Sequence, residues 1–195
     1  MQGETAAADI STSYAFRASL VGAAHRFELT KAGLAWQFAG RSAVWPYAEI
    51  SAITLSYRPV WMQAHRFRAD IRHESGARLS ILSTSWQTAA LMAAQDDLYR
   101  AFIRDLHARL AAAGSRAKLN GGLGRISYAA AVALAALVGV MLIILFFRAL
   151  VTGEYAGALF FIGFAALFGW QIGGFVRSNR PVVYSWDGLP AALLP

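Results

Sequence analysis

The side chains that could support chemistry in this sequence are few and poorly spaced for it. Histidines stand at positions 25, 65, 73 and 107, and no two of them have the spacing of metal ligands. The absence of cysteine excludes disulfides, thiolate metal sites and a cysteine nucleophile. The sequence shows neither a Ser-His-Asp grouping nor a glycine loop that could cradle phosphate. We therefore predict no metal, no cofactor and no enzymatic activity.

Charged side chains recur through FRADIRHESGARLSIL, residues 67–82. If the apolar residues of two strands are to share one face here, residue 71 must pair with residue 79. Residues 74–76 then form a three-residue turn with glycine at its left-handed position. The opposite face carries one acid and four arginines: Arg66, Arg68, Asp70, Arg72 and, directly across from Arg72, Arg78.

Like charges across a strand pair are unfavourable, which predicts an anion or a lipid headgroup at these four arginines. The alternative is a solvated basic face that Asp70 and Glu74 relieve.

A second candidate contact site is the strand connection YRPVWMQAH, residues 57–65. Its tip carries Val60, Trp61 and Met62 beside Arg58. Loop tips are normally polar, so this tip predicts contact with a bilayer or a protein partner. The alternative is that Trp61 folds back over the mouth of its own domain.

Apolar residues alternate with period two between Tyr14 and Ser83, and glycine or proline breaks separate the runs. This pattern predicts about seven short strands. After Trp86 the period becomes helical and predicts one amphipathic helix, whose apolar stripe is Leu91, Leu98, Phe102, Leu106 and Leu110. Such short strands need closure and a lid to bury their apolar faces, which favours a half-open barrel capped by the helix.

Seven strands followed by one helix resemble the pleckstrin-homology-like (PH-like) fold. The stretches LTKAGLAWQF and VWPYAEISAI are similar to a turn and a corner of bacterial PH domains in membrane proteins. The resemblance covers about residues 14–112 and brings no catalytic residues with it. The expected fold class is α+β: a PH-like seven-stranded half-open barrel with a C-terminal helix, followed by an antiparallel transmembrane helical hairpin.

Two uncharged runs, 126–147 and 155–176, exceed the roughly 20 residues that cross a bilayer, and they predict this hairpin. Basic residues flank it at Arg109, Arg116, Lys118, Arg125, Arg177 and Arg180, whereas the connecting loop offers only Arg148. This bias places both termini in the cytoplasm. The start of the chain lacks the features of a signal peptide, which agrees with that orientation.

The expected organisation is a flexible N-terminus (1–13), a cytoplasmic domain (14–112), a basic linker (113–125), the hairpin and a cytoplasmic tail (177–195). Residues 1–116 should then fold alone, because the alternation and the helix supply a core. Abundant alanine, and arginine in place of lysine at nearly all basic positions, fit a GC-rich bacterial genome. The expected location is the bacterial inner membrane.

Small residues recur every four positions in both apolar runs, as Ala131, Ala135 and Gly139 and as Ala165, Gly169 and Gly173. Such stripes let helix backbones approach closely, so we predict that the two helices pack through them. The alternative is that the stripes dock onto another subunit.

The tail, NRPVVYSWDGLPAALLP, carries Tyr184 and Trp186, which suit the membrane interface or a partner surface. Lipid, the protein's own domain and a partner all remain possible surfaces for it. The net charge of +7 lies largely beside the apolar runs, which favours anionic lipid over nucleic acid.

Two functions follow from the sequence. The first is a non-enzymatic accessory or assembly subunit, with the hairpin packed on a larger membrane complex and the domain and tail on its cytoplasmic face. The second is a scaffold that binds anionic lipid or forms homo-oligomers. A transporter is disfavoured, because the two helices carry no intramembrane charge.

Overall fold

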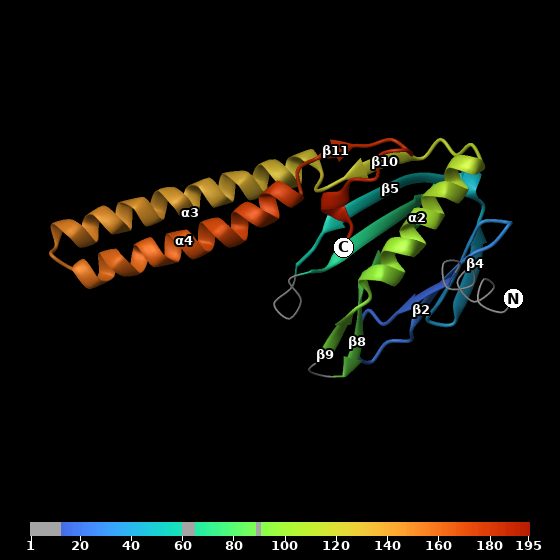
Figure 1. Ribbon diagram of the computed structural model, residues 1–195, viewed down its shortest axis with the longest axis horizontal. Helices are drawn as coiled ribbons and strands as arrows, with labels where there is room; N and C mark the ends of the chain where they lie inside the picture. The colour runs from blue at the N-terminus through green and yellow to red at the C-terminus, as the bar shows by residue number, and fades with distance from the viewer. Residues whose placement is uncertain (1–12, 60–64, 89–90) are drawn as a thin grey trace, which may run out of the picture. The chain divides into compact units, whose positions relative to one another are not determined.

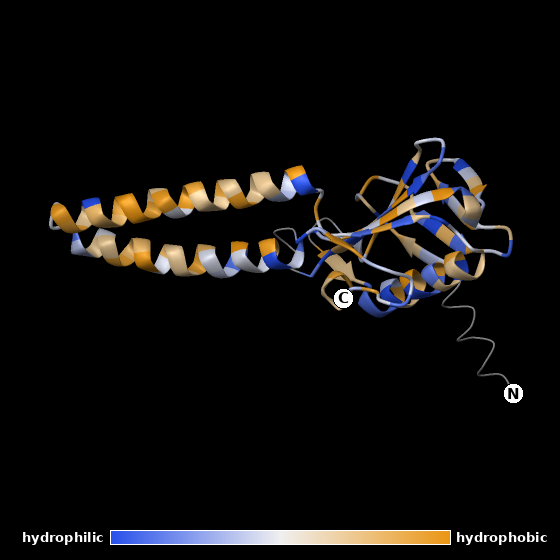
Figure 2. Cartoon of the chain, turned by 90° about the horizontal axis from the view of Figure 1, so that it is seen from above, coloured by the Kyte–Doolittle hydropathy of each residue, from blue (hydrophilic) through white to orange (hydrophobic). Residues whose placement is uncertain are grey.

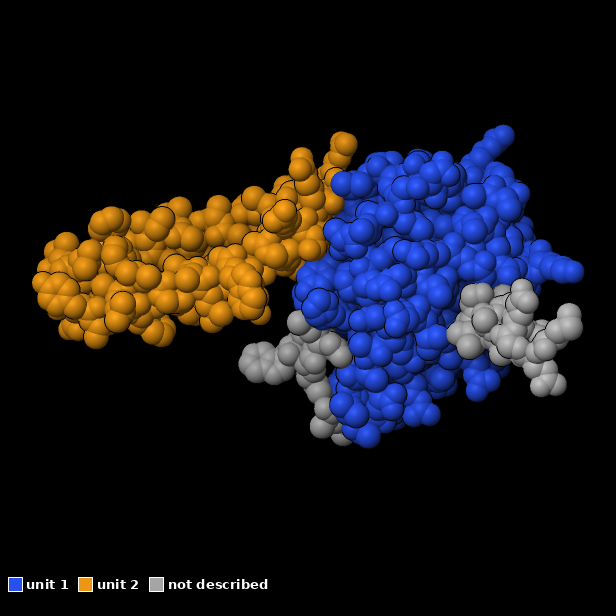
Figure 3. All heavy atoms as spheres, in the orientation of Figure 1, with its two compact units in different colours: residues 1–122, 182–195 blue, residues 123–181 orange. Residues whose placement is uncertain are grey.

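The structure, a computed structural model, describes residues 13–59, 65–88 and 91–195. The chain is an α+β protein with a sheet-rich N-terminal part and two long apolar helices. It divides into two compact units, of which the first contains residues up to 122 together with 182–195 and the second contains residues 123–181 (Figure 3). Residues 1–12 of the expected flexible N-terminus and the loop tip with Val60, Trp61 and Met62 lie outside the described residues.

The first sheet of unit 1 is an antiparallel meander of β1 (Ser13–Phe16), β2 (His25–Leu29), β3 (Leu34–Phe38) and β4 (Arg41–Trp45). Alternate residues of β1 and β2 are buried, as the period-two pattern predicts. The β2–β3 turn requires glycine at position 33, where φ is 148°. A Cβ atom there would lie 2.1 Å from the carbonyl oxygen of Trp45.

The second sheet begins after a short 3₁₀ turn, η1 (Tyr47–Glu49), with the antiparallel strands β5 (Ile50–Tyr57), β6 (Phe67–His73) and β7 (Arg78–Leu82). The predicted register is confirmed, because Ile71 pairs with Leu79 and Arg72 pairs with Arg78. The turn is closed by a hydrogen bond from the His73 N–H to the Ala77 carbonyl, and φ of Gly76 is +86°. The turn therefore has the left-handed glycine that the sequence predicts.

Two further strands extend this sheet beyond β5 (Figure 1). Strand β10 (Lys118–Gly121) pairs in parallel with β5, and β11 (Val182–Val183) pairs antiparallel with β10. The order across the sheet is β11-β10-β5-β6-β7. The segment expected as a linker and the tail after the helices therefore each supply a strand to the same sheet.

A separate β-hairpin, β8 (Thr84–Thr88) with β9 (Leu91–Ala94), precedes helix α2 (Asp96–Ala112). The predicted helical stripe is confirmed for its last three members, Phe102, Leu106 and Leu110, which are fully buried. It is wrong for its first two. Leu91 lies in β9 and is 56% exposed, and Leu98 lies in the first turn of α2 and is 44% exposed.

The apolar face of α2 joins the core that the two sheets share. The buried face of α2 also contains Tyr99, Ile103 and His107. The predicted stripe that begins at Leu91 does not include these three residues. The two sheets meet where the Tyr14 hydroxyl of β1 donates to the Leu82 carbonyl of β7 at 2.6 Å. The β8–β9 hairpin contacts the first sheet where the Trp86 N–H donates to the carbonyl of Arg17, just after β1. The strand pairing of the described residues does not close into a barrel.

Unit 2 is a helical hairpin of α3 (Arg125–Val151) and α4 (Tyr155–Ser178). Both helices are apolar along most of their length (Figure 2) and long enough to cross a membrane. The connecting turn has Gly153 at φ +77°, and the Thr152 hydroxyl caps the Arg148 carbonyl at 3.0 Å. The two predicted apolar runs thus correspond to two candidate membrane-spanning helices.

Candidate functional site

A row of basic side chains crosses the second sheet on its outer face, the face opposite its buried residues. Residues paired across neighbouring strands point to the same side of a sheet. Lys118 pairs with Ala52, Ala52 with Arg72, and Arg72 with Arg78. All three basic residues are exposed. We call Lys118, Arg72 and Arg78, arranged around Ala52, the basic row.

The acid that could neutralise the basic row is engaged elsewhere. The Asp70 carboxylate accepts hydrogen bonds from Arg68 Nε at 2.8 Å and from the Ser80 hydroxyl at 2.6 Å. Arg68 also donates to Ser80 Oγ at 2.9 Å, which closes a three-member network. The ion pairs among the described residues include neither Arg72 nor Arg78.

The other two predicted contact arginines lie at the far end of the strand pair. Arg66 precedes β6, and its carbonyl accepts the Arg58 N–H at 2.8 Å. Arg66 Nε is buried without a hydrogen-bond partner among the described residues. Burial, and then the nearby Arg68 charge, lower the pKa of Arg66. Arg66 therefore lies close to the Arg68 charge, which is itself paired with Asp70. Arg58 itself is exposed beside the undescribed loop tip.

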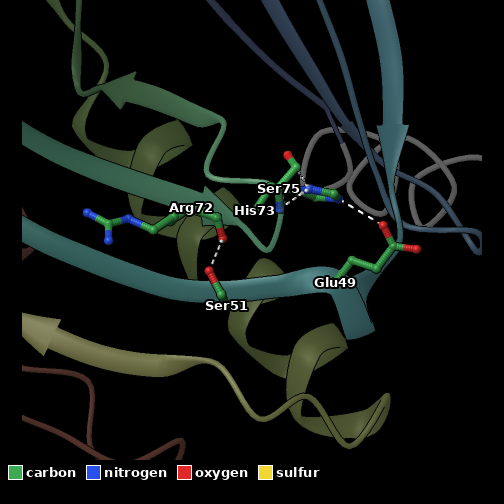
Figure 4. Close-up of polar contacts among 5 residues, drawn as sticks. All are labelled: Glu49, Ser51, Arg72, His73 and Ser75. Carbon is green, nitrogen blue, oxygen red and sulfur yellow. Dashed lines mark hydrogen bonds and ion pairs between the residues drawn. The ribbon is translucent and has the colours of Figure 1, made fainter.

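Polar contacts fix the end of β6 next to the basic row (Figure 4). His73 Nε2 lies 2.9 Å from Glu49 Oε2, and His73 Nδ1 lies 2.9 Å from Ser75 Oγ. The Ser51 hydroxyl donates to the Arg72 carbonyl at 3.1 Å. The Arg72 side chain points away from the Glu49–His73–Ser75 contacts. These contacts hold the backbone of Arg72 and leave its guanidinium free to meet a ligand.

The line of Ser75, His73 and Glu49 has the order of a nucleophile, a base and a carboxylate, which the sequence did not reveal. The contacts of these three residues join the β6–β7 turn to η1. Ser75 and Glu49 are exposed, and the Ser75 N–H also donates to His73 Nδ1 at 3.2 Å. Nδ1 thus contacts both the hydroxyl and the N–H of Ser75, and the imidazole ring lies tilted at 43° to the Trp45 ring, with their centroids 4.8 Å apart. We assign the line to fixing the β6–β7 turn against η1.

The tail after α4 lies on the tail's own domain, one of the three surfaces that the sequence left open. The Tyr184 hydroxyl donates to Nε2 of the buried His107 at 3.0 Å, and His107 Nδ1–H donates to the Ile103 carbonyl at 2.7 Å. The Trp186 ring packs edge-on against the same imidazole. Burial lowers the pKa of His107, which favours the neutral ring that this pair of bonds requires.

The end of the tail is also anchored to unit 1. Leu193 is 3% exposed and Leu194 is 8% exposed, and both belong to the core of unit 1. Arg100 on α2 donates through Nε and Nη2 to the Pro195 carbonyl oxygen. Tyr184 and Trp186, predicted as membrane or partner contacts, are therefore held at least partly by α2.

The α3–α4 hairpin carries a groove of about 540 Å³ along its length. Small and large apolar side chains from both helices line it: Val132, Ala135, Gly139, Leu142, Ile143, Phe146, Phe161, Ile162, Ala165, Phe168, Gly169, Ile172, Gly173 and Val176. Five of the six predicted packing residues belong to this set, which we call the hairpin groove. The sixth, Ala131, lies one turn before Ala135 on α3.

Within the hairpin, close approach occurs near the turn. Ala149 and Ala158 are buried there, and a Cβ at Gly157 would lie 3.8 Å from the Ala149 Cβ. By contrast, a Cβ at Gly139, Gly169 or Gly173 would meet nothing within 4 Å. The small-residue stripes of both helices therefore border open space.

Among the described residues, no group of three or more histidine, aspartate or glutamate side chains could hold a metal ion. Comparison of the chain with protein-family models, curated proteins and solved structures finds no match. The basic row, the docked tail and the hairpin groove are the candidate functional features of the described residues.

Proposed function

We propose that the protein is a non-enzymatic accessory or assembly subunit that packs its α3–α4 hairpin onto a larger membrane complex. The observation that carries this proposal is the hairpin groove. Small residues in membrane helices let another backbone approach closely. Gly139, Gly169 and Gly173 receive no neighbour from their own hairpin, so they are available to a helix of another subunit.

Support for a two-pass topology comes from unit 1. Gly121 pairs with Val182, so the chain enters the hairpin from one strand and returns into the adjacent strand of one folded sheet. A folded domain lies on one side of a membrane, and both ends of the hairpin must then lie on that side. The basic flanks of α3 and α4 favour the cytoplasm, and in a bacterium the inner membrane.

The same unit supports a PH-like assignment for the domain that would contact the cytoplasmic face of the complex. A four-stranded meander, a three-stranded antiparallel set and a helix follow one another along the chain, as that fold requires. The additions are the β8–β9 hairpin and the strands β10 and β11. The tail, held on α2, would present its exposed side to the complex together with the domain.

The test is a pair of matched substitutions on α4. Gly169→Leu fills the hairpin groove, whereas Gly163→Leu adds the same side chain at a position outside its lining. Gentle detergent extraction, native sizing and mass spectrometry should show the parent in a stoichiometric heteromeric particle. Gly169→Leu should release it, and Gly163→Leu should not. A monomeric parent would sink the proposal.

A self-oligomerising scaffold is the second candidate, because the same groove could receive a second copy of α3 or α4. It predicts a particle that contains this chain alone and falls apart in the Gly169→Leu variant. Native mass therefore separates the two candidates with the same samples.

A further inference from the structure

We propose that the basic row is a binding site for the phosphate groups of an anionic lipid surface. Lys118 belongs to this site, although it is distant in sequence from the arginines and was expected only as part of a linker. The site lies on unit 1 and does not involve the hairpin groove, so this proposal and the proposed function can fail independently.

The strand order sets the dimensions of the site. Neighbouring strands lie about 4.8 Å apart, so Arg72 and Arg78 begin about 5 Å from each other and Lys118 begins about 10 Å from Arg72. Ala52 occupies the position between Lys118 and Arg72. Its methyl group leaves room for a phosphate group between two long cationic side chains. Arginine can bind phosphate oxygens through two parallel N–H bonds, which suits this arrangement.

The charges of the basic row are unbalanced within the described part of the chain. Like charges on directly paired residues are unfavourable, and a partner carboxylate would be the simplest relief. Asp70 is the acid nearest along β6, but Arg68 and Ser80 hold its carboxylate. Glu49 pairs with His73 instead. Glu74 is exposed in the β6–β7 turn, and the ion pairs among the described residues do not join it to the row. An external anion would supply the compensation that these contacts leave missing.

A membrane surface fits this site better than a free phosphate ion. The basic side chains are exposed, and water and salt weaken a single contact between exposed charges. A bilayer presents many phosphates at once, and each basic residue near an anionic surface adds to the attraction. Lys118 also lies seven residues before Arg125, the start of α3, a separation of at most roughly 24 Å along an extended chain.

The experiment uses the full-length chain in nanodiscs and a thiol placed in the centre of the row. The protein has no cysteine, so Ala52→Cys gives a unique probe, and Ala43→Cys on β4 of the first sheet gives its control. Each is treated with an uncharged maleimide in neutral phosphatidylcholine discs and in discs that also contain phosphatidylglycerol. The measured quantity is the ratio of the two reaction rates.

Contact with anionic lipid should slow the reaction at position 52 about fivefold or more and leave position 43 unchanged. High salt should remove the effect. Replacing the three basic residues of the row by glutamine should return the ratio to one. The matched control replaces Arg17, Arg26 and Arg41, three exposed arginines outside the second sheet, and should keep the protection. Unchanged circular dichroism of both triple variants shows that folding is retained.

Three results would overturn the proposal. Equal rates at position 52 in neutral and anionic discs would remove lipid as the ligand. Protection by inorganic phosphate alone in neutral discs would assign the row to a soluble phosphate compound. Protection in native membranes but not in anionic discs would assign it to an acidic protein surface.

Discussion

The tail should decide whether the sheet-rich domain folds. Fragment 1–116 lacks β10, β11 and everything after them, although it contains every strand and helix that the sequence predicted for the domain. We compare it with a fusion in which residues 122–181 are replaced by the two-residue turn Asn-Gly. Gly121 and Val182 are directly paired antiparallel residues, which a two-residue turn can join.

The difference can be worked from three core leucines that the short fragment loses. Leu119, Leu193 and Leu194 are 5%, 3% and 8% exposed. Burying one leucine side chain contributes about 1.5–3 kcal/mol, so the three contribute roughly 5–9 kcal/mol as an upper estimate. Small domains are stable by only about 5–15 kcal/mol. We therefore expect the fusion to fold and fragment 1–116 to be largely unfolded or aggregated, which reverses the sequence-based expectation that residues 1–116 fold alone.

Circular dichroism and urea unfolding of the two purified proteins measure this difference. A matched control is the fusion with Leu193→Ala, which should lose about 2–5 kcal/mol and remain more stable than the fragment. If fragment 1–116 unfolded at the same urea concentration as the fusion, the tail would contribute nothing to the core, and the docking of Leu193 and Leu194 would be refuted.

Two further predictions concern single positions. Gly33→Ala should destabilise the fusion by several times the roughly 1 kcal/mol expected for Gly40→Ala. Both glycines have positive φ, but only the new methyl group at position 33 would clash with the Trp45 backbone. The midpoints of urea unfolding of the two variants measure the difference. Burial lowers the pKa of His107 in the folded state, so its stability contribution is present above pH 6.5, the ordinary pKa, and is lost as pH falls below it. The melting temperature of the fusion should drop there, and Tyr184→Phe should cost about 1 kcal/mol at neutral pH, where a zero effect would argue against the His107–Tyr184 bond.

Features with a strong local pattern could be predicted from the sequence. The β6–β7 register followed from the alternation of apolar residues and from Gly76, because a one-residue slip would turn every side chain to the wrong face. The apolar helices followed from length and absence of charge. The predicted helix stripe was wrong at Leu91, which lies in the four-residue strand β9. Its seven-residue distance from Leu98 matches a helical spacing by coincidence.

Contacts between distant segments needed the tertiary structure. Strand β10 is four residues long and β11 only two, too short for any periodicity, and each exists because a neighbouring strand offers free hydrogen-bonding groups. Sequence charge alone marked Arg72 and Arg78, but Lys118 joins them only through the parallel pairing of β10 with β5. The tail composition suited lipid, partner or domain equally well.

The small-residue stripes show most clearly what the sequence determines and what the tertiary structure decides. Their four-residue spacing on α3 and α4 is written in the sequence, and it identified helix faces that allow close packing. The spacing of the small residues does not determine which helix packs against that face. The hairpin makes its close contact at Ala149, Gly157 and Ala158, near a turn too short to separate the helices there, and leaves Gly139 and Gly169 open. Sequence therefore determined the faces, and the connection between the helices decided which of them the protein itself fills.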